Sequence, residues 1–156
     1  RRYWAACQIG DLRGTRLLDV GCGYGFLLPF AVGAGVIEYV GIDILPEYVS
    51  AARQLAGLVG DRVVVRFEAM SVHAAGAVQE PFDWVVALGV AGYGDRQYLG
   101  TVMADAWALA RRGLVFSPNR EFASASELLR LAKQHTEHVV LREDVWAQDV
   151  MLYLLR

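Results

Sequence analysis

Residues 17–26 read LLDVGCGYGF and residues 39–43 read YVGID. Both stretches begin as apolar strands, and the first runs directly into glycines at positions 21, 23 and 25. Because glycine has no Cβ, such a turn bends tightly and lies close against a ligand. Asp43 ends the second strand, at about the 20-residue spacing at which a carboxylate binds a ribose diol. The two stretches therefore predict a site for a nucleoside cofactor.

Two residues of the motif distinguish between cofactors. The nicotinamide dinucleotide fingerprint Gly-x-Gly-x-x-Gly has its third glycine where this chain has Phe26. Asp19 lies in the first strand, where its charge would repel a pyrophosphate but could orient the turn and attract a cationic ligand. S-adenosylmethionine carries an ammonium and a sulfonium group and has no phosphate. The pattern therefore favours S-adenosylmethionine over a dinucleotide.

At these residues the chain resembles the class I S-adenosylmethionine-dependent methyltransferases, whose first motif reads closely as Leu-Asp-Val-Gly-Cys-Gly-x-Gly. The resemblance implies S-adenosylmethionine as cofactor and S-adenosylhomocysteine as product. It implies that Asp43 takes both ribose hydroxyls and that Ile44 lies beside the adenine; the alternative for Asp43 is a turn or helix-cap residue before Pro46. Four residues match the motif around the methionine part of the cofactor: Asp19, Gly21, Gly23 and Gly25.

Three further residues complete the cofactor site that the resemblance implies. Ser71 stands where relatives have an acid that accepts from the adenine amino group. A serine hydroxyl accepts without charge, so adenine recognition would rest on Ser71 and on the backbone at Met70. Leu88, at the end of the fourth strand, would line the floor between cofactor and substrate.

The chain alternates strands and helices without a linker, a repeat or a low-complexity segment. Apolar runs predict seven strands, at 17–20, 39–43, 63–67, 82–88, 114–116, 139–141 and 150–155. After a first helix that ends near Gly10, helices are expected at 26–32, 46–56, 97–111 with Gly113 closing it, and 124–135 with a capping box. We therefore predict one domain, residues 1–156, of the α/β class. It is a Rossmann-like three-layer sandwich with a seven-stranded, mostly parallel sheet and an antiparallel last strand.

The composition argues against some classes of binding partner and favours one cellular compartment. The 156 residues are 55% hydrophobic and carry a formal net charge of −2, which argues against a large nucleic-acid footprint. Cys7 and Cys22 form neither a disulfide framework nor the spacing of a metal site, so no metal is expected. No 18-residue apolar run and no secretory leader are present, so we expect a cytoplasmic protein with no membrane partner.

The sequence identifies no side chain as a catalytic base, so the catalytic residues stay unassigned. His73 could reach the site or lie on a surface helix, and Tyr93, Asp95 and Asn119 lie in the two loops where substrate-facing groups belong. The Asn/Asp-Pro-Pro-aromatic motif and the Pro-Cys nucleophile are both absent. The expected acceptor is therefore a small molecule.

The last third of the chain resembles a group of small bacterial methyltransferases of unassigned substrate, in the segments 108–113, 126–129 and 138–144. Those relatives have a longer N-terminal segment over the site, so an open site or a missing lid is expected here. The apolar strand 151–155 is expected at the sheet edge and, if exposed and long, could pair in a homodimer. Two alternative functions stay open: a catalytically silent cofactor-binding or partner domain, and an NAD-dependent oxidoreductase or epimerase.

Overall fold

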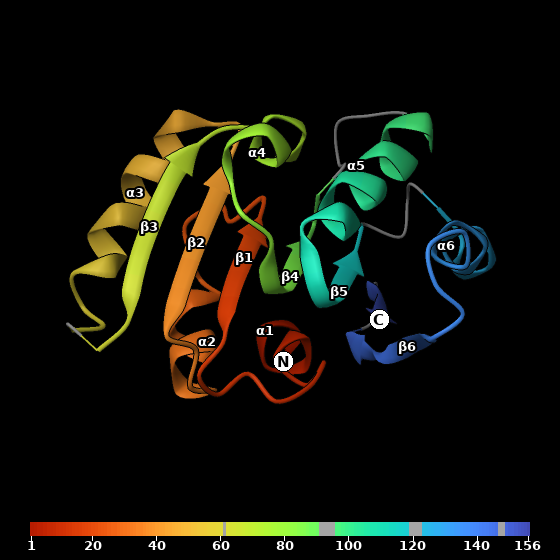
Figure 1. The fold of residues 1–156 in the computed structure, drawn as a ribbon, viewed down its shortest axis with the longest axis horizontal. Coiled ribbons are helices and arrows are strands. Elements are labelled where there is room, and N and C mark those ends of the chain that lie inside the picture. Colours follow the sequence, from red (N-terminus) through yellow and green to blue (C-terminus); the bar gives the residue numbers. More distant parts are fainter. Residues whose placement is uncertain (61, 91–95, 119–122, 147–148) are drawn as a thin grey trace.

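The computed structural model describes residues 1–60, 62–90, 96–118, 123–146 and 149–156. Its centre is a seven-stranded sheet in the order β3-β2-β1-β4-β5-β7-β6. The strands are β1 (Arg16–Val20), β2 (Glu38–Asp43), β3 (Val64–Ala69), β4 (Phe82–Leu88), β5 (Ala110–Ser117), β6 (Val139–Trp146) and β7 (Asp149–Leu155). The helices are α1 (Arg2–Ala6), α2 (Leu28–Gly33), α3 (Pro46–Ala56), α4 (Val72–Val78), α5 (Arg96–Ala108) and α6 (Ala125–Ala132). Figure 1 shows them around the sheet.

Strand pairing confirms the predicted fold class. β1 to β5 are parallel, and β7 is antiparallel to both of its neighbours, β5 and β6. Leu18, Val85 and Leu114, in the three central strands, have no exposed surface. Strands buried on both faces are continuously apolar because helices cover each side of the sheet. This is the alternating α/β sandwich that the sequence predicts.

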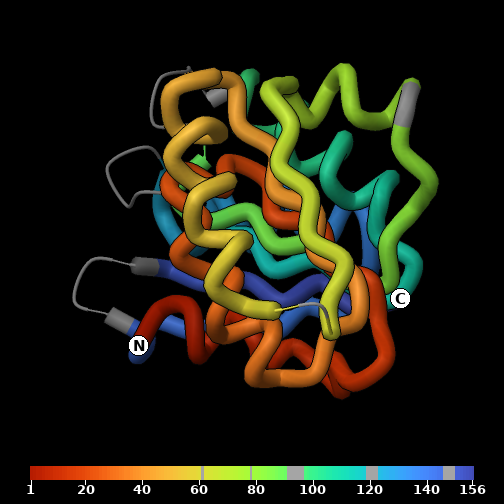
Figure 2. Tube along the Cα trace, turned by 90° about the vertical axis from the view of Figure 1, so that its left-hand side faces the viewer, coloured from red at the N-terminus to blue at the C-terminus, as the bar shows by residue number. Residues whose placement is uncertain are grey.

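Two hydrophobic clusters fill the space between the layers. One joins the sheet to α4, α5 and α6 and includes Val72, Met103 and Leu128. The other joins the opposite face to α1, α2 and α3 and includes Leu28 and Val49. Figure 2, seen from the β3 edge, shows α3 on one side of the sheet and α4 and α5 on the other.

The capped and proline-initiated helices lie where the sequence predicts them. α3 begins with Pro46 at its first position, where a missing N–H costs nothing. α6 begins with the predicted capping box, in which the Glu127 N–H donates to Ser124 Oγ at 3.3 Å and Ser124 N donates to Glu127 Oε2 at 3.0 Å. Local side-chain chemistry decides these boundaries.

The region around Gly113 differs from the prediction. The expected helix to residue 111 ends at Ala108, and Gly113 lies within β5 instead of closing the helix. A Cβ at Gly113 would be 2.6 Å from the carbonyl oxygen of Leu154 in β7. The glycine therefore permits the close approach of a neighbouring strand, a contact with no local signature.

The position of the last strand corrects a second expectation. β7 lies between β5 and β6, and Met151, Leu152 and Leu154 have no exposed surface. The strand expected at the sheet edge is therefore internal, and the argument for pairing through it is wrong. The edge strand on this side is β6. Tyr153 of β7 also donates its hydroxyl to the carbonyl oxygen of Ala5 at 2.9 Å, which ties the last strand to α1.

The order in which strands are added to the sheet reverses between β1 and β4. β2 and β3 are added on one side of β1, and β4 and β5 follow on its other side. In open α/β sheets ligands bind outside the carboxyl ends of the strands at such a switch point. The glycine turn after β1 and the ends of β2 and β4 meet at this edge. Among the described residues, every helix is too short or too polar to cross a membrane.

Candidate cofactor-binding site

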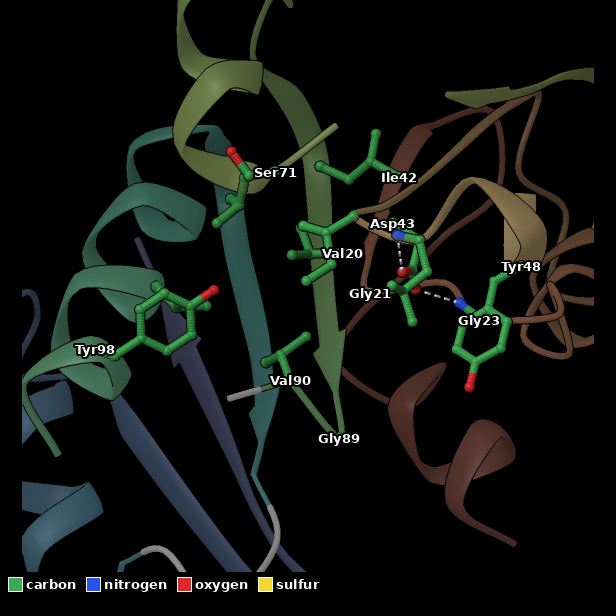
Figure 3. A pocket seen from close by; sticks show the side chains of 14 residues that line it. Val20, Gly21, Gly23, Ile42, Asp43, Tyr48, Ser71, Gly89, Val90 and Tyr98 are labelled. Atoms are coloured by element: carbon green, nitrogen blue, oxygen red, sulfur yellow. Dashed lines mark hydrogen bonds between the residues drawn. The ribbon is translucent and has the colours of Figure 1, made fainter. Parts of the chain in front are cut away.

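A cavity of about 420 Å³ opens at this edge of the sheet. Its volume lies within the range of roughly 300–1,000 Å³ that is usual for small-molecule sites. In Figure 3, Ser71 and Tyr98 lie on one side of the cavity, Gly23 and Tyr48 on the other, and Asp43 between them. The lining comprises Val20, Gly21, Gly23, Ile42, Asp43, Ile44, Leu45, Tyr48, Ser71, Val72, Gly89, Val90, Tyr98 and Val102.

The three motif glycines all have positive φ, but they serve different purposes. Gly23 has φ +51°, and a Cβ there would meet nothing within 4 Å, so its backbone borders open space. A Cβ on Gly21 would be 2.5 Å from Cγ1 of Val90, which therefore lies directly against the turn. Gly25 is outside the lining, and its Cβ would be 3.0 Å from the Phe67 ring. Gly23 is thus the glycine most directly available to a ligand.

Asp43 connects the glycine turn to the end of β2. Its Oδ2 accepts from the backbone N–H of Gly23 at 2.9 Å, and its Oδ1 accepts from that of Leu45 at 3.0 Å. The residue is 8% exposed and lines the cavity. Each carboxylate oxygen has two lone pairs, so both can accept a further hydrogen bond from a ligand. Asp43 therefore has the turn-bracing role of the alternative interpretation and remains able to bind hydroxyl groups.

Asp19 is buried beneath the same turn, outside the cavity lining. It is 3% exposed, and the Tyr39 hydroxyl donates to its Oδ2. Burial raises the pKa of Asp19 from 3.8 to about 7; the Tyr39 hydrogen bond lowers it and the charge of Asp43 raises it. Among the described residues, neither Asp19 nor Asp43 has a cationic partner. The turn therefore lies between two carboxyl groups, neither of which forms an ion pair with a described basic side chain.

Both cysteines are buried and unsuited to nucleophilic attack. Burial raises the pKa of Cys7 to about 11, and burial also raises the pKa of Cys22 strongly, with Asp19 and Asp43 adding to the effect. Both thiols stay protonated near neutral pH, and a protonated thiol is a poor nucleophile.

The far end of the cavity combines apolar side chains with one hydroxyl. Ile44 is 57% exposed and lines the cavity, as does Val72. Ser71 also lines it and caps α4, accepting from the N–H of Ala74 at 3.1 Å. Met70 lies outside the lining, and its N–H already donates to the Asp43 carbonyl at 2.9 Å.

The structure brings together five of the nine predicted cofactor residues: Gly21, Gly23, Asp43, Ile44 and Ser71. The other four lie outside the lining: Asp19, Gly25, Met70 and Leu88. Gly89 and Val90 line the cavity where Leu88 was expected to.

The sequence interpretation missed the contribution of the helices after β2 and β4. Tyr48 comes from the first turn of α3, and Tyr98 and Val102 come from α5. The Tyr48 ring lies 4.8 Å from that of Tyr24 in the glycine turn. Counting one helical turn past each strand end would have indicated Tyr48, because helix starts lie beside the ligand at such an edge.

The one described candidate for acid–base work, His73, does not reach the cavity. His73 lies outside the lining, and its Nδ1 is 2.6 Å from Oδ2 of Asp105 on α5. Tyr93, Asp95 and Asn119 fall outside the described residues. Within the described ranges, no cluster of histidine, cysteine or acidic side chains could hold a metal ion.

Comparison with known sequences identifies related proteins. The profile of a family described as "Methyltransferase domain" matches residues 17–113, more than half of the chain. A tRNA U34 carboxymethyltransferase of Pseudomonas paraeruginosa is 36% identical over 84 residues, which are 51% of this chain and 24% of that protein. A ribosomal protein L11 methyltransferase of Symbiobacterium thermophilum is 41% identical over 63 residues, 40% of this chain and 21% of that protein. The matched parts of the chain thus cover less than a quarter of the length of these relatives.

Comparison with solved structures agrees with the fold. The magnesium protoporphyrin IX methyltransferase of Synechocystis, crystallised with bound S-adenosylmethionine, superimposes with a TM-score of 0.78 at 21% identity. The match covers 99% of this chain and 76% of that one. The family match includes the glycine turn, Asp43 and the strand that ends at Leu88. The chain therefore belongs to the methyltransferase-domain family, as its resemblance to the class I S-adenosylmethionine-dependent enzymes predicts.

Proposed function

We propose that this domain binds S-adenosylmethionine in the cavity and transfers its methyl group to a small-molecule acceptor. The observation that carries the proposal is the pair of carboxyl groups, Asp19 and Asp43, on either side of a glycine turn without a cationic partner among the described residues. A site of this charge attracts an ammonium or sulfonium group and repels a pyrophosphate. It therefore favours S-adenosylmethionine over NAD.

The cavity offers complementary surfaces for each part of this cofactor. The carboxylate of Asp43 has lone pairs for the ribose hydroxyls, and the Gly23 backbone leaves room for the methionine chain. Ile44, Val72 and Val102 provide apolar contact for the adenine. The Ser71 hydroxyl accepts from Ala74 and can still donate to an acceptor nitrogen on the ring.

Methyl transfer requires few catalytic groups from the protein, because the sulfonium already activates the methyl group. The domain has to hold the nucleophile in line with the methyl carbon at about 3 Å. Gly89 and Val90, which follow β4, border the cavity on the side where the acceptor would enter. Positioning at this edge is therefore the main catalytic contribution of the chain.

Surface charge supports a small-molecule acceptor. Three arginines at the described surface are paired with nearby acids: Arg13 with Asp11, Arg66 with Glu38 and Arg142 with Asp144. Recognition of RNA needs clustered basic side chains that are available to phosphate groups. The names of the two matched relatives indicate tRNA and a ribosomal protein as their substrates, so the acceptor class needs a direct test.

Two measurements test the proposal. Calorimetric titration with S-adenosylmethionine, S-adenosylhomocysteine and NAD should show binding of the first two and none of NAD. Incubation of a bacterial extract with methyl-labelled cofactor should then place label in the small-molecule fraction. Label in RNA or protein instead would overturn the acceptor class, and binding without any transfer would indicate a silent cofactor-binding domain.

A further inference from the structure

We propose that the buried carboxyl group of Asp19 distinguishes the charged cofactor from its neutral product, being ionised beneath S-adenosylmethionine and protonated beneath S-adenosylhomocysteine. The inference rests on the proposed function, because it concerns the same two ligands. It assigns a role to a motif residue that lies outside the cavity lining.

The position of Asp19 places its charge close to the cofactor while keeping it away from water. It directly precedes Val20 and lies two residues before Gly21, both of which line the cavity. Its own side chain lies on the side of the sheet that faces α1, 3% exposed, where the Tyr39 hydroxyl donates to it. Charges interact more strongly across such a dry interior than through solvent.

The groups around Asp19 leave its charge uncompensated. From α1 come Tyr3 and Cys7, from the glycine turn Cys22, and from β2 Tyr39 and Asp43. Four of these are neutral near pH 7, and Asp43 is an acid. Arg2, the cation of α1, donates to the carbonyl oxygen of Ser117 in β5. Arg2 keeps its charge, but no described cation is hydrogen-bonded to Asp19 or acts on its pKa, so a bound sulfonium would add an attraction that the empty site does not supply.

Burial and the neighbouring acid hold the pKa of Asp19 near 7, so a change of one charge nearby alters its protonation at neutral pH. S-adenosylmethionine has one more positive charge than S-adenosylhomocysteine, at the sulfur. Its binding lowers the pKa of Asp19, and the carboxyl proton leaves for solvent. Binding of the product adds no such charge, so the pKa of Asp19 stays near 7 and more of the carboxyl group remains protonated.

Methyl transfer reverses this ionisation. The S–CH3 bond breaks with its electron pair going to sulfur, a bond forms between the methyl carbon and the acceptor, and the positive charge passes to the acceptor or leaves as a proton. The sulfur is then a neutral thioether, and Asp19 takes a proton from solvent. The product loses the attraction that held the substrate cofactor, which favours exchange of one for the other.

Calorimetry of the unmodified protein tests the inference first. Titrations near pH 7 in two buffers of different ionisation enthalpy give the number of protons released on binding. S-adenosylmethionine should release more protons per site than S-adenosylhomocysteine. Equal release by the two ligands overturns the inference and leaves the proposed function intact, whereas binding of neither ligand overturns both.

The Asp19→Asn variant provides the second test, since its carboxamide oxygen still accepts from Tyr39 and its volume is unchanged. In the unmodified protein the ratio of the two dissociation constants should shift in favour of S-adenosylmethionine between pH 5.5 and 8. The shift approaches about tenfold if the pKa of Asp19 differs by one unit between the complexes. In Asp19→Asn the shift should shrink to that of the ligands' own titration, which is common to both proteins.

Asp144→Asn is the matched control, because it removes one carboxylate at the exposed edge strand β6. This control should keep the pH-dependent ratio of the unmodified protein. A ratio that keeps its full pH dependence in Asp19→Asn would falsify the inference even if both ligands bind.

Discussion

The backbone N–H of Gly23 donates to Oδ2 of Asp43 at 2.9 Å, so the glycine turn after β1 is held by the acid at the end of β2. One residue therefore shapes the turn and presents a carboxylate to the cavity. This coupling explains why binding and local stability cannot be separated at Asp43 by a single substitution.

Asp43→Ala should weaken binding of S-adenosylmethionine by about 1–3 kcal/mol, because hydrogen bonds to a charged group are lost. Titration calorimetry measures the change. Asp105→Ala, which removes an acid paired with His73 outside the cavity, should bind like the unmodified protein. Unchanged affinity in Asp43→Ala would show that the carboxylate does not meet the ligand.

Gly23→Ala and Gly14→Ala form a matched pair. Both glycines have positive φ, +51° and +69°, and a Cβ on either meets nothing within 4 Å. Each variant should lose about 1–2 kcal/mol of unfolding free energy through backbone strain. Only Gly23→Ala, and more severely Gly23→Val, should lose cofactor binding, because only Gly23 borders the cavity. Equal binding of the cofactor by the two alanine variants would show that the glycine turn is not part of the binding site.

Ser71→Ala and Ser124→Ala compare two helix N-caps. Ser71 caps α4 and Ser124 caps α6, so each variant should lose about 1 kcal/mol of stability. Ser71 alone lines the cavity. Thermal unfolding should report similar losses for both variants, while only Ser71→Ala should weaken S-adenosylmethionine binding. Equal affinities would restrict Ser71 to its capping role.

The stability of the cofactor-free protein should fall as pH rises from about 5 to 8. The pKa of Asp19 is raised from 3.8 to about 7 in the folded state, so between about pH 5 and 7 the folded state binds the proton and the unfolded state does not. Stability therefore decreases with pH, by an amount on the order of 3 kcal/mol, and the decrease is complete above pH 7. Chemical denaturation at pH 5.5 and 8.5 measures it.

Asp19→Asn should abolish this pH dependence and should be more stable than the unmodified protein at pH 8.5, because a neutral amide has no charge to desolvate. The variant keeps an acceptor for Tyr39. An unmodified protein whose stability is constant over this range would show that Asp19 is not the titrating group.

Much of the fold could be predicted because its signals are local. The bounds of α3 and β4 match the expectation, since Pro46 starts the helix and the run at 82–88 is apolar. α4 was not predicted as an element. Its sequence, VHAAGAV, has no strong helical periodicity, and the signal at its start is the Ser71 cap alone. Short elements held by tertiary packing have little local signature.

The candidate site likewise contains some residues that local sequence signals indicate and others that they do not. The turn and Asp43 follow from motif and spacing, and both line the cavity. The roles of Gly25 and Tyr48 depend on neighbours distant in sequence: a Cβ on Gly25 would meet the Phe67 ring, and Tyr48 lies against Tyr24. Contacts of this kind depend on how layers meet, which no local pattern encodes.

The hydrogen bond from Tyr153 to the carbonyl of Ala5 joins residues separated by 148 positions. During synthesis α1 emerges early, but its partner in β7 emerges only after every other strand of the sheet. β6 likewise has no sheet neighbour until β7 is made, because β7 is the strand that joins it to β5. Closure over such a sequence separation is slow. The first helix and the edge strand should therefore be the last parts of the chain to become protected from hydrogen exchange during folding.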